Sequence, residues 1–164
     1  MKSRAVLAFL AAAGLAAAVF AQTKSSGTIQ CGKGDPAHMI EVGDKPDHSM
    51  GVSKSTCTWT KPLELAGLKS KDGYSVFAAD STAGKFSGHG VHVSTMDNGD
   101  KIYVKFQGGG SMKDGVTQTD SGTWSYTGGS GKLKGIKGHG TYKGKGSADG
   151  GVTYEIEGDY QLPK

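Results

Sequence analysis

Apolar and polar side chains alternate along most of this sequence, and almost no segment has the residue spacing of an amphipathic helix. In the segment 101–107, every second residue is apolar: Ile102, Val104 and Phe106. The segment 152–162 alternates over its whole length, with apolar residues or glycine on one face and polar residues on the other. Successive side chains of a strand point to opposite faces, so this pattern predicts strands with one buried face.

Turn signals divide the alternating segments. Asn98-Gly99 favours a tight hairpin because both residues tolerate positive φ, and it predicts that 88–107 forms one hairpin. Further strands are predicted at 39–42, 50–59, 74–80, 116–126, 133–143 and 152–162, and a short helical turn at 62–68. Seven or eight short strands predict one all-β domain over residues 22–164, an antiparallel barrel of about eight strands. A closed barrel is favoured over a sandwich because the chain has few residues that guard a sheet edge.

The first residues have the layout of a secretory signal peptide. Lys2 and Arg4 precede an apolar run at 5–20, and Ala21 is a suitable residue before the cleavage site. The run is shorter than the roughly 20 residues of a membrane-spanning helix. We therefore predict that residues 1–21 are removed and that the protein is periplasmic or secreted, without a transmembrane anchor after processing.

The net charge limits the classes of partner to expect, and the cysteines predict a cross-link. Without Lys2 and Arg4, the 19 basic residues become 17 against 15 acidic ones, which gives no general electrostatic reason to bind nucleic acid. Cys31 and Cys57 are the two cysteines of a chain sent to an oxidising compartment, and they predict one structural disulfide.

The segment 127–146 is rich in glycine and lysine, as a phosphate-binding loop would be. It lacks the spacing of a P-loop or dinucleotide fingerprint, and no helix is predicted after it, so we interpret it as a bent strand after a turn. Its five lysines form a candidate patch for an anionic polymer such as a glycan, lipopolysaccharide or DNA: Lys132, Lys134, Lys137, Lys143 and Lys145. The alternative is a solvated strand surface.

This segment and its neighbours carry a family resemblance. The sequences Ser-Gly-Thr-Trp at 121–124, Gly-Gly-Ser-Gly-Lys-Leu-Lys-Gly-Ile-Lys-Gly at 128–138 and Gly-Thr-Tyr at 140–142 resemble the paired strands of allene oxide cyclase and dirigent barrels. Glu-Gly-Asp-Tyr at 157–160 resembles small secreted bacterial proteins of that class. The resemblance covers mainly residues 86–162 and departs from the usual pattern at Ser130, where threonine is typical. It implies an antiparallel barrel of about eight strands, often oligomeric, whose interior can hold an apolar ligand, and it implies no activity.

Histidine and methionine residues near the N-terminus suggest a metal site. A turn at 43–46 would place Met39 opposite Met50, with His38 and His48 nearby. Imidazole nitrogen and thioether sulfur suit copper, Cu(I) in particular, and no zinc motif is present. The alternative is that the histidines are solvated and the methionines pack. No cofactor motif occurs in the sequence.

We predict from these observations a β-barrel protein that binds a small apolar ligand in its interior, or an anionic envelope polymer, without catalysis. The alternative is an isomerase or cyclase that uses the barrel interior, for which the sequence assigns no catalytic residue. The two functions require different interiors. An enzyme needs a deep pocket with convergent polar groups, whereas a barrel filled by the apolar faces of 101–107 and 152–162 leaves no room for a substrate.

Overall fold

The computed structural model describes residues 22–163, which form ten β-strands and one short 3-10 helix. The strands are β1 (Thr23–Cys31), β2 (Ala37–Glu41), β3 (His48–Lys61), β4 (Glu64–Leu65), β5 (Leu68–Thr82), β6 (Lys85–Met96), β7 (Lys101–Lys113), β8 (Val116–Gly129), β9 (Lys137–Gly146) and β10 (Val152–Gln161), and the 3-10 helix is η1 (Gly131–Leu133). The predicted signal segment 1–21 lies outside the described residues. Within 22–163, no helix has the length and apolar character needed to cross a membrane.

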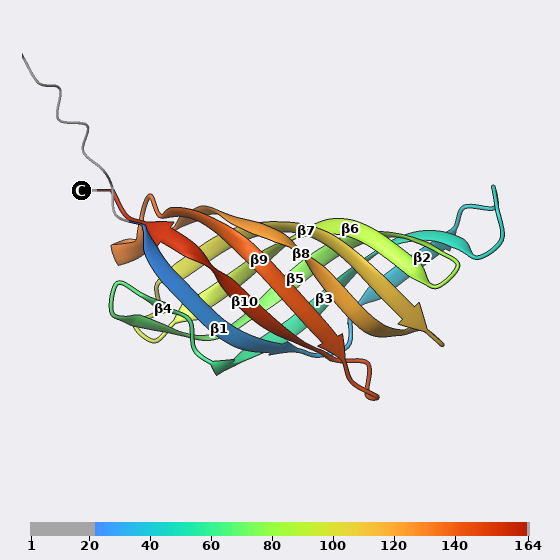
Figure 1. Ribbon diagram of the computed structural model, residues 1–164, viewed down its shortest axis with the longest axis horizontal. Coiled ribbons are helices and arrows are strands. Elements are labelled where there is room, and N and C mark those ends of the chain that lie inside the picture. The colour runs from blue at the N-terminus through green and yellow to red at the C-terminus, as the bar shows by residue number, and fades with distance from the viewer. Residues whose placement is uncertain (1–21, 164) are drawn as a thin grey trace, which may run out of the picture.

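Eight antiparallel strands close into a barrel, as Figure 1 shows. The strands follow the order β3-β1-β10-β9-β8-β7-β6-β5, and β5 pairs with β3 to close the sheet. Two further strands extend it: β2 pairs with β3 at one end of the barrel, and β4 pairs with the start of β5 at the other. The predicted all-β fold and eight-stranded closed barrel are confirmed.

The predicted hairpin at 88–107 is confirmed. Strands β6 and β7 pair from Thr95 opposite Lys101 to Lys85 opposite Ser111, so the hairpin is longer than predicted. Gly99 lies in the turn with a φ of 89°, a conformation that glycine adopts without strain. The side chains of Ile102, Val104 and Phe106 face the barrel interior, as their spacing predicted.

The strand predicted at 133–143 is wrong at its start. Residues Gly131–Leu133 form η1, and β9 begins only at Lys137. Leu133 and Ile136 are both fully buried, whereas a strand would have pointed them to opposite faces. Positive φ angles at Gly131 (52°) and Gly135 (79°) bend the chain, so both side chains enter the end of the barrel.

The helical turn predicted at 62–68 is also wrong. The segment is a tight hairpin between β4 and the first residues of β5, with Leu65 opposite Leu68. Ala66 and Gly67 form its turn, and both have positive φ, as in the two-residue turns that suit hairpins. The hairpin buries Leu63, Leu65 and Leu68, and burial of these leucines explains why it replaces a helical turn.

Strand β1 was missing from the sequence prediction. Its inward positions alternate, but most are small or polar: Ser25, Gly27, Ile29 and Cys31. Gly27 leaves space for the ring of Trp59, because a Cβ atom at this position would lie 2.8 Å from that ring. The alternation of buried and exposed positions in this strand is therefore not visible as an alternation of apolar and polar residues in the sequence.

The two ends of the barrel differ. Six buried side chains close the end near β4 and η1: Leu63, Leu65, Leu68, Met96, Leu133 and Ile136. At the opposite end, near β2, the loops 32–36 and 147–151 border the interior without covering it. The barrel is thus plugged at one end and open at the other.

Candidate functional site

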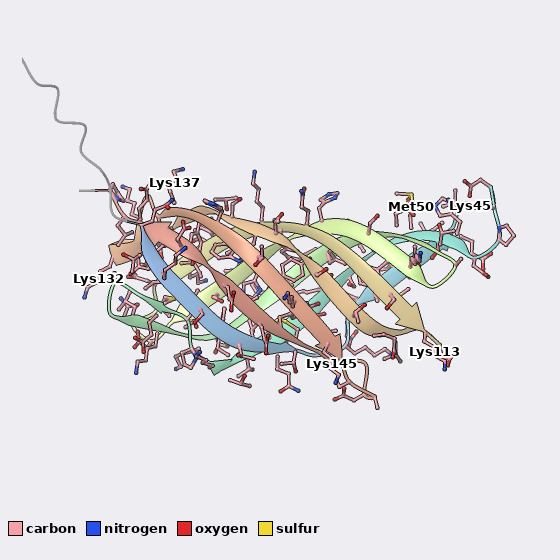
Figure 2. The ribbon with its side chains drawn as sticks, in the orientation of Figure 1. Lys45, Met50, Lys113, Lys132, Lys137 and Lys145 are labelled. Atoms are coloured by element: carbon pink, nitrogen blue, oxygen red, sulfur yellow. A yellow bond between two sulfur atoms is a disulfide. The ribbon has the colours of Figure 1, made fainter. Side chains whose placement is uncertain are left out.

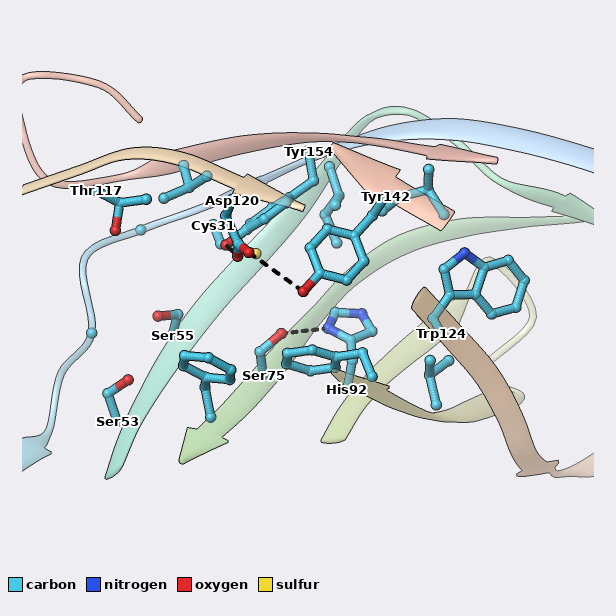
Figure 3. A pocket seen from close by; sticks show the side chains of 18 of the residues that line it. Cys31, Ser53, Ser55, Ser75, His92, Thr117, Asp120, Trp124, Tyr142 and Tyr154 are labelled. Carbon is cyan, nitrogen blue, oxygen red and sulfur yellow. Dashed lines mark hydrogen bonds between the residues drawn. The ribbon is translucent and has the colours of Figure 1, made fainter. Parts of the chain in front are cut away.

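A cavity of about 220 Å³ lies inside the barrel and is open to solvent. Inward-facing residues from all eight barrel strands line it, and Gly32, Gly34 and Gly150 of the loops lie along it at the open end. Figure 3 shows the labelled polar side chains pointing into one space. The barrel is hollow, so the apolar faces of 101–107 and 152–162 form cavity walls and do not fill the interior.

Aromatic rings form much of the cavity wall. Phe77 and Phe106 stack with ring centroids 5.8 Å apart, and Tyr142 meets Phe106 edge to face at 6.2 Å. Glycines on β6 make room for these rings, because a Cβ atom on Gly88 would lie 2.7 Å from Phe77 and one on Gly90 would lie 2.5 Å from Phe106. Such walls favour planar aromatic ligands, which pack against ring faces and edges.

Asp120 of β8 places a carboxyl group inside this aromatic cavity. It is only 7% exposed, and it accepts hydrogen bonds from Tyr142 Oη at 3.4 Å and Tyr154 Oη at 3.1 Å. Burial raises the pKa of Asp120 above its usual value, although both tyrosine hydrogen bonds act in the opposite direction. Burial also raises the pKa values of Tyr142 and Tyr154, so both phenols stay protonated and act as donors.

The position of Asp120 depends on its glycine neighbours. It lies opposite Gly110 of β7 and Gly144 of β9. A Cβ atom on Gly144 would lie 2.5 Å from the Tyr154 ring, so a side chain there would displace the tyrosine that binds the carboxyl. A buried carboxyl group with a raised pKa can bind a protic group of a ligand or exchange a proton with it.

His92 of β6 lies on the same cavity and is neutral. Its Nδ1 lies 2.9 Å from Ser75 Oγ, and its Nε2 lies 2.8 Å from Ser94 Oγ. Ser94 Oγ also accepts a hydrogen bond from Trp59 Nε1 at 2.8 Å. Burial lowers the pKa of His92 to about 4. The imidazole is thus a fixed, uncharged part of the wall.

The predicted disulfide between Cys31 and Cys57 is present. It joins β1 to β3, where the two residues lie directly opposite each other, and Cys31 lines the cavity. Disulfides persist mainly in oxidising compartments, so this bond fits a location outside the cytoplasm.

The predicted copper residues lie on the β2–β3 hairpin, outside the barrel cavity. The predicted register is wrong by one residue: Met39 lies opposite Gly51, and Met50 lies opposite Ile40, so the two methionines point to opposite faces. His38 is opposite Val52, four residues along β3 from His48, a separation of about 13 Å.

His48 is held by carboxylates. Its Nδ1 bonds Asp44, and its Nε2 lies 3.3 Å from Asp80 Oδ1, contacts that raise the pKa of His48. Among residues 22–163, no group of three or more His, Cys, Asp or Glu side chains is arranged to hold a metal ion. Copper binding by His38, Met39, His48 and Met50 stays a prediction that this geometry does not favour.

The five predicted lysines are exposed on the outer surface. Figure 2 shows Lys132 and Lys137 near the plugged end and Lys145 at the far end of β9, so the charges are spread along the barrel. Carboxylates lie beside them, because Lys143 is directly opposite Glu155 of β10. Binding of an anionic polymer by Lys132, Lys134, Lys137, Lys143 and Lys145 also stays a prediction.

Neither Asp120 nor His92 was among the predicted site residues, although the sequence pattern marks both. In the predicted strand 116–126, Asp120 has the same parity as Trp124 and Tyr126, so it belongs to the apolar face. His92 likewise shares a face with Phe86 and Met96 of β6. A titratable residue on the buried face of a strand is unusual and marks a candidate site.

No family model matches the sequence, and no curated protein matches it. One match among solved structures is a protein titled pyocyanin demethylase, with 18% identity, a TM-score of 0.43, and coverage of 81% of this chain and 98% of that chain. A likeness at this TM-score carries no argument about fold or function. The eight-stranded barrel rests on the strand pairing above, and membership of the allene oxide cyclase class stays a prediction.

Proposed function

We propose that this protein binds a small aromatic molecule inside its barrel, outside the cytoplasm. One observation carries the proposal: a solvent-open cavity of about 220 Å³ combines aromatic walls with the buried carboxyl group of Asp120. Ligand pockets typically have this composition, an apolar lining with a few polar groups that orient the ligand. The signal-like segment 1–21 and the disulfide support a periplasmic or secreted location.

Filling the cavity should abolish binding. Ser55 of β3 lines the cavity, so Ser55→Phe places a ring in the space that the ligand would occupy. We expect this variant to bind 1,4-naphthoquinone at least about tenfold more weakly than the wild type, because overlap with a ligand costs more than 1.4 kcal/mol. Quenching of tryptophan emission measures the affinity, since both tryptophans of the chain, Trp59 and Trp124, line the cavity.

The neighbouring residue provides a matched control. Thr56 lies on the same strand, but its side chain is exposed on the outer face. Thr56→Phe adds the same ring outside the barrel, and its affinity should stay within about twofold of the wild type. Equal weakening in both variants, or unchanged binding by Ser55→Phe, would place the ligand outside the barrel and contradict the proposal.

The polar groups of the cavity support a second candidate function, proton transfer to or from a bound carbon acid, as in an isomerase. Asp120 has a raised pKa, and Tyr142 and Tyr154 lie beside it. In such a reaction the ionised carboxylate takes a proton from carbon, the electron pair forms an enolate, and the proton returns to carbon.

Exchange of deuterium from solvent into 2-tetralone, followed by NMR, tests this function. The wild type should accelerate exchange at the acidic carbon, and Asp120→Asn should lower the enzymatic rate by about a hundredfold or more. Only the ionised carboxylate accepts a proton, so the rate should rise with pH through a range above that of an ordinary aspartate. Retained 1,4-naphthoquinone binding would show that the variant is folded, and a wild-type rate equal to the uncatalysed rate would leave binding as the only function.

A further inference from the structure

Four side chains form a continuous hydrogen-bonded series that ends at the cavity. Trp59 Nε1 donates to Ser94 Oγ at 2.8 Å, Ser94 Oγ lies 2.8 Å from His92 Nε2, and His92 Nδ1 lies 2.9 Å from Ser75 Oγ. Trp59, His92 and Ser75 line the cavity, and Ser94 is fully buried behind them. Trp59 is the first residue of the series, and its role as donor or acceptor determines which group donates in each of the following hydrogen bonds.

The direction is set by the indole group. An indole nitrogen can only donate, so Ser94 Oγ is an acceptor in its bond with Trp59. The hydroxyl hydrogen of Ser94 then needs an acceptor of its own, because a buried hydroxyl without a partner carries the full penalty of its lost hydration. The acceptor within reach is Nε2 of His92.

The tautomer of His92 follows from this requirement. The imidazole is neutral, so it carries one proton, and a lone pair on Nε2 leaves that proton on Nδ1. Nδ1–H therefore donates to Ser75 Oγ at 2.9 Å. The opposite tautomer would direct two donors at Ser94 and leave the Ser94 hydroxyl hydrogen without a partner.

Ser75 is left with a hydroxyl hydrogen to donate. Its other neighbour is Cys57 Sγ at 3.8 Å, which belongs to the disulfide and is a weak acceptor. Figure 3 shows the Ser75 hydroxyl bonded to His92 and facing the open space of the cavity. Ser75 therefore donates its hydroxyl hydrogen toward the cavity. Asp120, elsewhere on the cavity wall, accepts hydrogen bonds from N–H or O–H groups.

We propose that the barrel selects planar aromatic compounds with a carbonyl or unprotonated ring nitrogen, which accepts a hydrogen bond from Ser75, and an N–H or O–H group, which donates to Asp120. This inference rests on the proposed binding function and specifies the chemistry of its ligand. Compounds of the 4-quinolone type have both features, with N–H and C=O groups on opposite sides of one ring.

Equilibrium dialysis with matched compounds tests the proposal. Ser75→Ala should weaken binding of 4-quinolone about fivefold, the effect of one hydrogen bond, and should change binding of naphthalene by less than about twofold. The compound 1-methyl-4-quinolone keeps the carbonyl and lacks the N–H group, so it should show the same sensitivity to Ser75→Ala. Ser87→Ala removes an exposed hydroxyl on the outer face of β6 and should change none of these affinities.

The outcomes separate this inference from the proposed function. If the wild type binds naphthalene and Ser75→Ala weakens 4-quinolone no more than naphthalene, the ligand chemistry is wrong and the binding function stands. If the wild type binds 1,4-naphthoquinone and none of these three compounds, the ligand chemistry is wrong. If it binds neither them nor 1,4-naphthoquinone, the binding function itself fails.

A measurement without any ligand tests the tautomer directly. In protein labelled with ¹⁵N-histidine, the His92 signals, assigned by their loss in His92→Gln, should show a protonated Nδ1 and an unprotonated Nε2. A protonated Nε2 would reverse the series and overturn the assignment of Ser75 as a donor.

Discussion

Removal of the disulfide, in the double variant Cys31→Ala/Cys57→Ala, is expected to lower the free energy of unfolding by about 3.5 kcal/mol. The two cysteines lie 26 positions apart in the sequence, and the bond removes conformational entropy from the unfolded chain by an amount that grows with the logarithm of the loop length. For a chain of this size the melting temperature should fall by about 10 °C. Urea unfolding followed by circular dichroism measures the change.

Wild-type protein unfolded in the presence of a reducing agent is the control. It should have the same unfolding midpoint as the double variant, because both lack the cross-link in the unfolded state. A double variant as stable as the oxidised wild type would show that the strand pairing alone holds β1 against β3, and would contradict the prediction.

Gly140→Ala is expected to destabilise the protein by about 3 kcal/mol, near the upper limit for overpacking. A Cβ atom at this position of β9 would collide with the carbonyl oxygen of Glu157 on β10 and would lie 2.7 Å from the Trp124 ring. The carbonyl belongs to the backbone of a paired strand, so the collision is relieved only by moving that strand. Urea unfolding measures this change as well.

Gly128→Ala on β8 is the matched control. Its added Cβ atom would meet its nearest neighbour, Tyr103 Cδ2, at 3.7 Å, which is ordinary van der Waals contact. We expect its stability to stay within about 1 kcal/mol of the wild type. Equal effects of the two substitutions would show that the contacts of the added Cβ atom with Glu157 and the Trp124 ring do not determine the stability, and would contradict the prediction.

The size of the inward-facing residues explains why some strands were predictable from the sequence and others were not. In 101–107 and 152–162 the inward positions are mostly large and apolar, so the alternation was visible and the predicted strands are confirmed. In β1 the inward positions are small or polar, because the Trp59 ring from β3 fills the space beside Gly27. A pattern within one strand cannot show an apolar contact that a distant strand supplies.

The candidate site was predictable only in part, for a related reason. The parity of Asp120 and His92 placed each on a buried face, but their partners come from other strands. The predicted copper residues are of types that bind copper, but a shift of one residue in strand register places the two methionines on opposite faces. Register depends on turn geometry and on pairing along the whole strand, which short segments do not specify.

The all-β class, the central hairpin and the disulfide were predictable from the sequence, because side-chain alternation, the Asn98-Gly99 turn and a pair of cysteines are local properties of the chain. The tertiary structure alone decided that the barrel is hollow, plugged at one end, and equipped with Asp120 and Ser75 on the wall of one cavity. Closing a sheet into a barrel brings residues of eight strands around one space. The volume and chemistry of that space depend on strand register and on which glycines face which rings.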